Sequence, residues 1–344
     1  MTSSKLRWGI VSTGVIAGTL ARALGKSKTC QLVAVASRTS ESAARFAREF
    51  GVPRAYSSYD ALLADPEVDV VYIATPHPSH AEWAIAAARA KKHILCEKPL
   101  AMNHAEVSAV VQAVREHDVF LMEAFMYRCH PQTHELVRLL RAGALGQVRA
   151  IHASFGFDGV FPATSRIIDN ELGGGGILDV GCYPVSMARL VAGVAVGDPF
   201  SEPLEVHAVG HVGQSSRVDE YTVAICKFPG EILATLATAV HLLQDNVVRI
   251  FGSEGQLLLR EPWLPARGRD FSELVIERPG RDPETIRVEA PQGPYEYEVD
   301  AVAAQITARQ ASEMTLLDSL GNALTLDRWR RAIGVTYAAD RTGA

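Results

Sequence analysis

The sequence is short of the features that mark several large classes of protein. Its 344 residues carry a net charge of −5, and no basic run is interleaved with aromatic residues, so neither nucleic acid nor an anionic membrane is expected as a partner. Charged residues interrupt each apolar stretch before it reaches the roughly 20 residues of a membrane span. Met1 to Lys5 lead directly into a strand pattern, without the apolar core of a signal peptide. The expected partner is a small molecule.

Cysteine is also sparse and follows no pattern. The five cysteines include no C-x-x-C pair, and an odd, unpatterned set in a chain without a signal sequence is typical of the reducing cytoplasm. His130 and His134 have the i, i+4 spacing of two zinc ligands, but no third ligand is placed by pattern and His134 does not open an H-E-x-x-H motif. We therefore expect a cytoplasmic protein without a metal site.

What the sequence does contain is the composition of an ordinary soluble protein, with 48% hydrophobic and 21% charged residues. The chain is long enough for two domains, because single domains mostly run about 100–200 residues. Strand and helix patterns alternate in the first third, whereas strand patterns prevail from Val148 onward.

A strand, a glycine turn and a helix open the chain. Leu6–Ser12 is short and apolar, and helical spacing follows the turn. The dinucleotide fingerprint G-x-G-x-x-G/A reads here as Ser12-x-Gly14-x-x-Ala17, which keeps the middle glycine that lets backbone N–H groups approach a pyrophosphate. The residues expected to bind the dinucleotide in this turn are Ser12, Thr13, Gly14, Val15 and Ile16.

The second strand pattern, Gln31–Ala36, is followed by Ser37 and Arg38. Proteins that prefer NAD usually carry an acidic residue here, which accepts hydrogen bonds from the ribose 2′-hydroxyl. This chain offers a hydroxyl and a guanidinium, and Arg38 can pair bidentately with a 2′-phosphate. The cofactor expected is NADP(H). The alternative for Arg38 is a solvated loop residue.

The alternation of strands and helices continues to Phe125 and predicts a doubly wound parallel sheet with right-handed crossovers. Its carboxyl edge therefore gathers the glycine turn, the loop after Val68–Ala74 and the charged residues that end the apolar run His93–Cys96. We expect His77 to face the nicotinamide half of the cofactor, and His80 either to contact the cofactor or to cap the following helix. The cofactor-binding residues expected in these two loops are Thr75, Pro76, His77, His80, Glu97 and Lys98.

After a helix over 131–142, five strand patterns separated by turn signals indicate a mostly antiparallel sheet. These strands are expected at 148–157, 205–212, 220–228, 232–242 and 246–259. The predicted fold is α/β: an N-terminal Rossmann domain over 1–125 that binds NADP, and an α+β domain over 126–344 for substrate binding and oligomerisation.

One segment interrupts the strands. Four glycines, 173–176, permit a close approach of the backbone, and a helix is expected to begin after them. Asp179 and Tyr183 are four residues apart, which would place both side chains on one face of this helix. The alternative is a helix cap followed by a buried tyrosine.

Together these motifs resemble one family. The degenerate glycine turn, Thr75-Pro76-x-x-x-His80 and Glu97-Lys98-Pro99 are similar to those of the Gfo/Idh/MocA oxidoreductases. Three further stretches, Arg7–Gly14, Leu121–Arg128 and Arg330–Tyr337, resemble its dimeric dihydrodiol dehydrogenases and NADP-dependent D-xylose dehydrogenases. The resemblance implies a cis peptide bond before Pro99. It also implies that the open face of the second sheet forms a subunit interface, in a homodimer or a tetramer.

The resemblance also suggests a mechanism for oxidising a hydroxyl group. Tyr183 is expected to act as the general base, and Lys98 to favour the phenolate, since an ordinary tyrosine pKa is about 10. Asp179 would hydrogen-bond the substrate or orient Lys98, and Glu97 would brace that lysine. Arg128 and Arg166 are candidates for contacts with substrate hydroxyls or with helix ends.

The leading hypothesis is an NADP-dependent sugar dehydrogenase that acts on the C1 hydroxyl of an aldose such as D-xylose. The enzymatic alternatives are a trans-1,2-dihydrodiol dehydrogenase and a reductase of keto-sugars such as 1,5-anhydrofructose. A non-catalytic NADP(H)-binding redox regulator is the alternative from another class. It is disfavoured because such a sensor would not need Lys98, Asp179 and Tyr183 together.

Overall fold

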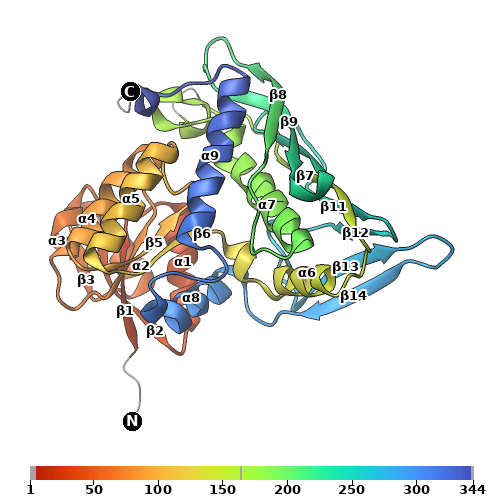
Figure 1. Ribbon diagram of the computed structural model, residues 1–344. Helices are drawn as coiled ribbons and strands as arrows, with labels where there is room; N and C mark the ends of the chain where they lie inside the picture. The colour runs from red at the N-terminus through yellow and green to blue at the C-terminus, as the bar shows by residue number, and fades with distance from the viewer. Residues whose placement is uncertain (1–4, 163–164, 342–344) are drawn as a thin grey trace. The chain divides into compact units, whose positions relative to one another are not determined.

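The computed structural model describes residues 5–162 and 165–341 (Figure 1). The chain forms two compact units. The first takes in the chain up to Ala101, Ala105–Cys129 and Gln292–Ser319, and the second takes in Met102–His104, His130–Pro291 and the chain from Leu320 on. The sequence-based division placed everything after 125 in the second domain. In the structure 126–129 and 292–319 belong to the first unit instead.

The first unit is a six-stranded parallel sheet in the order β3-β2-β1-β4-β5-β6, as the alternation of strands and helices predicts. Its strands are β1 (Leu6–Val11), β2 (Cys30–Ala36), β3 (Arg54–Tyr56), β4 (Val70–Ile73), β5 (His93–Glu97) and β6 (Leu121–Ala124). Its helices are α1 (Val15–Lys26), α2 (Ser40–Phe50), α3 (Tyr59–Leu63), α4 (His80–Arg89), α5 (His104–His117) and α8 (Pro294–Gln305), with short 3₁₀ turns η1 (His77–Ser79), η2 (Met126–Cys129) and η7 (Ile306–Ala308).

Strand order in this sheet reverses between β1 and β4, which are neighbours at its centre. Every residue of β4 is buried, as the continuous apolar run of a central parallel strand requires. Open α/β sheets bind their ligands outside the carboxyl ends of the strands at such a switch point. The edge at which a cofactor is expected to bind is therefore formed by the loops after β1, β2, β4 and β5.

Helix α8 joins the first unit from the far end of the sequence. Its buried side chains Val299 and Val302 are fully inaccessible, and the helix packs against α1, β2 and η2. Burial of this apolar face explains why 292–319 belongs to the first unit, although the strand patterns of the sequence predicted one domain from 126 to the end.

The second unit contains an eight-stranded sheet in the order β14-β13-β12-β11-β7-β10-β9-β8. Its strands are β7 (Val148–Gly156), β8 (Glu205–Val212), β9 (Asp219–Phe228), β10 (Ile232–Ala239), β11 (Val248–Gly252), β12 (Gln256–Leu259), β13 (Phe271–Glu277) and β14 (Glu284–Glu289). Helices α6 (Pro131–Arg141), α7 (Cys182–Val196) and α9 (Leu316–Ala332, from Leu320 on) accompany them, with the short helices η3 (Arg166–Ile168), η4 (Asn170–Leu172), η5 (Ile177–Gly181), η6 (Pro229–Glu231) and η8 (Ala338–Asp340).

This sheet is mostly antiparallel, as expected, but β7 and β10 pair in parallel and make it mixed. The single strand expected over 246–259 is two strands, β11 and β12, because the turn Ser253-Glu254-Gly255 reverses the chain. The hairpin of β13 and β14 had no predicted counterpart.

The segment Asn170–Val196 corrects the expectation that no stretch is apolar enough for a membrane span. Its mean hydropathy reaches 1.4 over 18 residues, and that window is entirely buried inside the protein. Helix α7, which forms most of it, packs against β7 and β10. Within the described residues this segment is therefore part of the buried core of the second unit.

Candidate active site

The turn between β1 and α1 leaves open space in front of its backbone. Gly14 has φ −71° and ψ 178°, a conformation that any residue adopts. A Cβ atom built on Gly14 would meet no atom within 4 Å, and the next residue, Val15, is 92% exposed. Neither strain nor crowding by the protein explains a glycine here. The space is a cradle in which the N–H groups at the start of α1 can meet a diphosphate.

Ser12 occupies the first glycine position of the fingerprint with φ +99°, in the region that favours glycine. Its side chain hydrogen-bonds the hydroxyl of Tyr59, whose pKa is raised by burial and partly lowered by the charge of Arg38. Tyr59 was not predicted as a site residue. Its position directly after β3 would have been the signal, but a three-residue strand carries too little pattern to be recognised.

The loop after β2 presents the expected pair of polar groups. Ser37 is buried, and its Oγ lies 3.3 Å from Oγ1 of Thr13, which joins the loops that follow β1 and β2. Arg38 is exposed. The structure thus places Ser12, Thr13, Gly14, Ser37 and Arg38 at one edge of the sheet, together with Tyr59.

The loop after β4 is held by a histidine. His80 is fully buried, and its two ring nitrogens each lie 2.8 Å from a carbonyl oxygen, that of Thr75 and that of Pro99. His80 therefore ties the loop after β4 to the turn after β5. The Oγ1 of Thr75 is buried and has no hydrogen-bond partner among the described residues, and His77 is buried in η1.

The turn after β5 fixes the backbone of Lys98. One carboxylate oxygen of Glu97 accepts a hydrogen bond from the hydroxyl of Tyr72, and the other accepts one from the backbone N–H of Lys98 at 3.3 Å. Glu123, at the end of β6, accepts the N–H of Leu100 at 2.9 Å. The Lys98–Pro99 peptide bond is cis, as the family resemblance implies, and Lys98 is half-buried.

In the second unit the four glycines lead into a π-helical turn, η5, and then into α7. Asp179 lies in the π-helical turn and Tyr183 in the first turn of α7, so the single α-helix expected to carry both is wrong. Both residues are buried, and Arg166 Nη2 lies 3.0 Å from Asp179 Oδ1. Arg166 is thereby engaged with the carboxylate that was expected to contact the substrate.

Two aromatic rings that the sequence did not single out surround Tyr183. Its ring centroid is 5.2 Å from that of Phe155 and 5.8 Å from that of Trp263, both in tilted or edge-on contact. The Trp263 indole N–H donates to the carbonyl oxygen of Ser154 at 2.8 Å, which fixes this ring. The tyrosine thus lies in an apolar, aromatic wall.

Both halves of the chain match a known family in sequence. Residues 6–125 match the description "Oxidoreductase family, NAD-binding Rossmann fold" of the GFO/IDH/MocA proteins, and residues 133–258 match the GFO/IDH/MocA C-terminal domain. The chain belongs to the Gfo/Idh/MocA oxidoreductase family. It is therefore an NAD(P)-dependent dehydrogenase or reductase that acts on CH–OH groups.

Proteins similar to this family member align with it over nearly its whole length. It is 36% identical to the trans-1,2-dihydrobenzene-1,2-diol dehydrogenase of Danio rerio, over 97% of this chain and 99% of that one. A variant of the 3-ketoreductase KijD10 from Actinomadura kijaniata, in complex with TDP-benzene and NADP, has a TM-score of 0.86 at 28% identity and 96% and 98% coverage. The aldose-aldose oxidoreductase of Caulobacter crescentus, complexed with glycerol, has a TM-score of 0.85 at 25% identity, with 96% and 97% coverage.

A second carboxyl group lies buried behind Glu97 in this Gfo/Idh/MocA protein. Glu298, on α8, is fully inaccessible, and neither of its oxygens has a hydrogen-bond partner among the described residues. Burial, and then the charge of Glu97, raise the pKa of Glu298 well above its ordinary value, which favours the neutral carboxyl group. Sequence reasoning could not find it, because the contact joins residues some two hundred positions apart.

His130 and Arg128 have structural partners. His130 precedes α6 and its Nδ1 accepts the N–H of Gln132 at 3.1 Å, and burial lowers its pKa to about 4. Arg128 is buried in an ion pair with Asp318 at 2.7 Å. Of the two alternatives for Arg128, this burial favours a structural contact. In the described part of the chain no three His, Cys, Asp or Glu residues are grouped to hold a metal ion.

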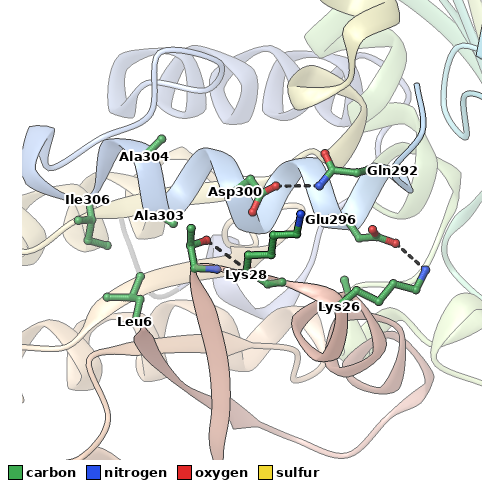
Figure 2. A pocket seen from close by; sticks show the side chains of 12 residues that line it. Leu6, Lys26, Lys28, Gln292, Glu296, Asp300, Ala303, Ala304 and Ile306 are labelled. Carbon is green, nitrogen blue, oxygen red and sulfur yellow. Dashed lines mark hydrogen bonds and ion pairs between the residues drawn. The ribbon is translucent and has the colours of Figure 1, made fainter. Parts of the chain in front are cut away.

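A cavity of about 550 Å³ lies at the opposite edge of the six-stranded sheet, within the first unit (Figure 2). It is bounded by the start of β1, the turn before β2 and one side of α8. Lys26 and Glu296 form an ion pair across it at 2.7 Å. Since Gly14 and Lys98 follow the carboxyl ends of their strands, this cavity belongs to the other end of the sheet from the cofactor cradle.

Proposed function

We propose that this enzyme oxidises the C1 hydroxyl of an aldose such as D-xylose to a lactone, with NADP⁺ as the oxidant. The observation that carries the cofactor choice is the loop after β2, where Arg38 is exposed and none of the residues 37–40 is a carboxylate that would repel a 2′-phosphate. The sugar substrate is supported by the similarity to an aldose-aldose oxidoreductase and to a 3-ketoreductase.

Oxidation of a CH–OH group removes a hydride from carbon and a proton from oxygen, and in the proposed chemistry the cofactor accepts the hydride and the protein accepts the proton. When bound, NADP⁺ would supply the nicotinamide ring as acceptor of the hydride from carbon. Tyr183 removes the hydroxyl proton, and the charge of Lys98 favours the phenolate and polarises the forming carbonyl group. Asp179, with Arg166 beside it, binds a substrate hydroxyl. Glu97 fixes the backbone of Lys98 and His77 contacts the nicotinamide half.

A second candidate is oxidation of a trans-1,2-dihydrodiol to a catechol. It is favoured by the aromatic wall that Phe155 and Trp263 form around Tyr183, because flat rings stack well on such a surface. The Danio rerio relative also carries the name of this activity. A 1,5-anhydrofructose-type keto-sugar reduction remains the reductive alternative.

The test is a substrate panel followed by NADPH absorbance. Aldoses, trans-dihydrodiols and, with NADPH, keto-sugars are compared by kcat/KM. A dihydrodiol preferred over every aldose would replace the first candidate with the second. Tight NADPH binding without turnover on any substrate would contradict both and favour the redox regulator.

Lys98→Met tests the assigned chemistry. We expect kcat to fall by about 10²–10⁴-fold, the range for loss of a group that assists proton transfer, while NADPH affinity changes by no more than a few-fold. Lys28→Met, on an exposed lysine at the cavity of the opposite edge, is the control and should keep full activity. Unchanged kcat in Lys98→Met removes this lysine from the mechanism.

We also propose that the protein is a homodimer formed through the sheet of the second unit. On β8, β9 and β10 apolar side chains are exposed in a continuous patch, since Val209 pairs with Val223 and Ile225 lies two residues further along β9. The patch consists of Val209, Tyr221, Val223, Ile225 and Leu233, each between 42% and 71% exposed. Such a contiguous apolar surface marks an interaction site.

A further inference from the structure

The four-glycine loop is packed against a buried carboxylate. Asp219 opens β9 and is fully inaccessible. Its Oδ2 accepts the N–H of Ile177 at 2.6 Å, and the N–H of Gly176 also donates to this carboxylate. Its Oδ1 has no hydrogen-bond partner among the described residues. Asp219 is not among the catalytic, cofactor-binding or substrate-binding residues expected from the sequence, and the proposed reaction does not use it.

Gly175 is required by this contact, and Gly176 lies close to it. Gly175 has φ +101°, and a Cβ atom there would lie 2.3 Å from Asp219 Oδ1. A Cβ atom on Gly176 would lie 3.2 Å from Oδ2. A side chain at Gly175 could not be accommodated without moving the carboxylate. The sequence left open what the glycine backbone approaches, and in the structure it is Asp219.

The contact lies at the start of the segment that carries the proposed catalytic groups. Ile177, whose N–H is bonded to Asp219, is the first residue of η5, which contains Asp179 and leads into Tyr183. Two neutral groups hold the same loop from other elements: Thr238 Oγ1 donates to the carbonyl of Gly176 at 3.1 Å, and the Tyr337 hydroxyl donates to that of Gly174.

Burial raises the pKa of Asp219 to about 7. The charged and titratable groups around it are Arg330 on α9, whose charge opposes this rise, and Tyr337, whose own pKa is raised by burial and by Asp219. Arg330 is itself bonded to Asp327 and Asp340. Asp219 therefore changes charge near neutrality, and its ionised form makes the stronger bonds to the two N–H groups.

We propose that Asp219 is a positioning residue, whose carboxylate fixes the glycine loop and the first turn of η5 and through them the places of Asp179 and Tyr183. The role of those two residues rests on the proposed function. The anchoring of the loop does not. Protonation of Asp219 weakens its bonds to the two N–H groups and also removes the cost of a buried charge, so 174–179 should loosen locally while the fold as a whole gains stability. Turnover should therefore fall below pH 7 without a matching change in cofactor affinity.

The loop is tested first, in the full-length protein without substrate. Hydrogen exchange of the amides of 176–179, corrected for intrinsic rates, should be about tenfold faster in Asp219→Asn than in the native protein at pH 8, since a bond to a charged acceptor is lost. At pH 5.5 the two proteins should exchange alike. Thr238→Val removes a neutral contact to the same loop and should leave the pH dependence as it is. Equal exchange in native protein and Asp219→Asn at pH 8 overturns the proposal.

Stability and activity provide two further readouts. Because the pKa of folded Asp219 is raised above its unfolded value, native stability is lost as pH rises towards 7, so the Tm of Asp219→Asn relative to native protein should increase from pH 5 to pH 8. On the best substrate of the panel, Asp219→Asn should lower kcat at pH 8 with KM for the cofactor consumed unchanged. If no substrate of the panel is turned over, the exchange and Tm results still decide whether Asp219 anchors the loop. If exchange in Asp219→Asn is altered but kcat is not, only the proposed effect of Asp219 on Asp179 and Tyr183 is overturned.

Discussion

Two glycines of this enzyme are explained by opposite physical causes. At Gly14 the backbone is one that any residue adopts and no protein atom approaches a built Cβ, so the missing side chain leaves room for something else. At Gly175 a positive φ and the carboxylate of Asp219 exclude a side chain. Gly14, whose backbone conformation and surroundings would both allow a side chain, is therefore a stronger indication of a bound ligand than Gly175.

Gly14→Ala should therefore separate binding from stability. We expect NADPH affinity to fall at least about tenfold, equivalent to roughly 1.4 kcal/mol, because the Cβ atom occupies the cradle. The free energy of unfolding should change by less than about 1 kcal/mol, since only the helix cap is affected. Gly25→Ala, in the same helix and also without neighbours, is the control that should keep full affinity. Titration by fluorescence and denaturant unfolding measure the two quantities.

Arg38→Asp should shift cofactor preference toward NAD. The substitution removes the guanidinium that pairs with a 2′-phosphate and supplies a carboxylate that accepts the ribose hydroxyl. The ratio of kcat/KM for NADP to that for NAD should fall by at least about tenfold, as expected for loss of a charge-assisted pair. A ratio that stays the same in Arg38→Asp means that Arg38 is only a solvated loop residue.

Residues that act through short-range patterns could be predicted, and those that act through distant contacts could not. Gly14, Thr75 and Lys98 follow strand ends, so their common edge is dictated by the alternation of strands and helices. Asp219 and Glu298 meet their partners across gaps in the sequence that carry no local signal. The aromatic contacts of Tyr183 arise in the same way, because β7 supplies Phe155 and a loop supplies Trp263.

At the scale of elements, an ion pair joins η2 to the first turn of α9. Asp318→Asn would leave the buried guanidinium of Arg128 without this carboxylate, and we expect a loss of about 3–5 kcal/mol in the free energy of unfolding. Asp118→Asn is the control, because it breaks an exposed pair with Arg309 and should shift the midpoint little. Urea denaturation compares them. A similar small effect of both would show that the buried pair does not stabilise the fold.

Elements with strong periodicity were predicted, whereas two of the edge strands, β3 and β14, were not. The edge strand β3 has only three residues, and β14 alternates exposed with half-buried positions, so neither has the apolar pattern of a buried strand. The π-helical turn that contains Asp179 was also beyond prediction. Its first residue, Ile177, is bonded to Asp219, some forty residues further along the chain, whereas local spacing favours an ordinary α-helix.

At the scale of the whole molecule, the exposed patch on β8, β9 and β10 makes assembly testable. Ile225→Glu places a charge in the middle of the proposed interface and should convert a dimer into a monomer in sedimentation velocity, because a buried unpaired charge costs several kcal/mol. Leu317→Glu, at an exposed apolar residue of the first unit, should remain dimeric. A monomeric native protein contradicts the proposal directly.

The return of α8 to the first unit has a consequence for synthesis. A ribosome that adds about 5–20 residues per second delivers α8 on the order of ten to forty seconds after β6 is complete. Until then α1, β2 and η2 lack the helix that packs against them. The nucleotide-binding unit of the nascent chain therefore lacks α8 while all strands of the second sheet are synthesised. The helices α8 and α9, which are synthesised last, complete the first and the second unit.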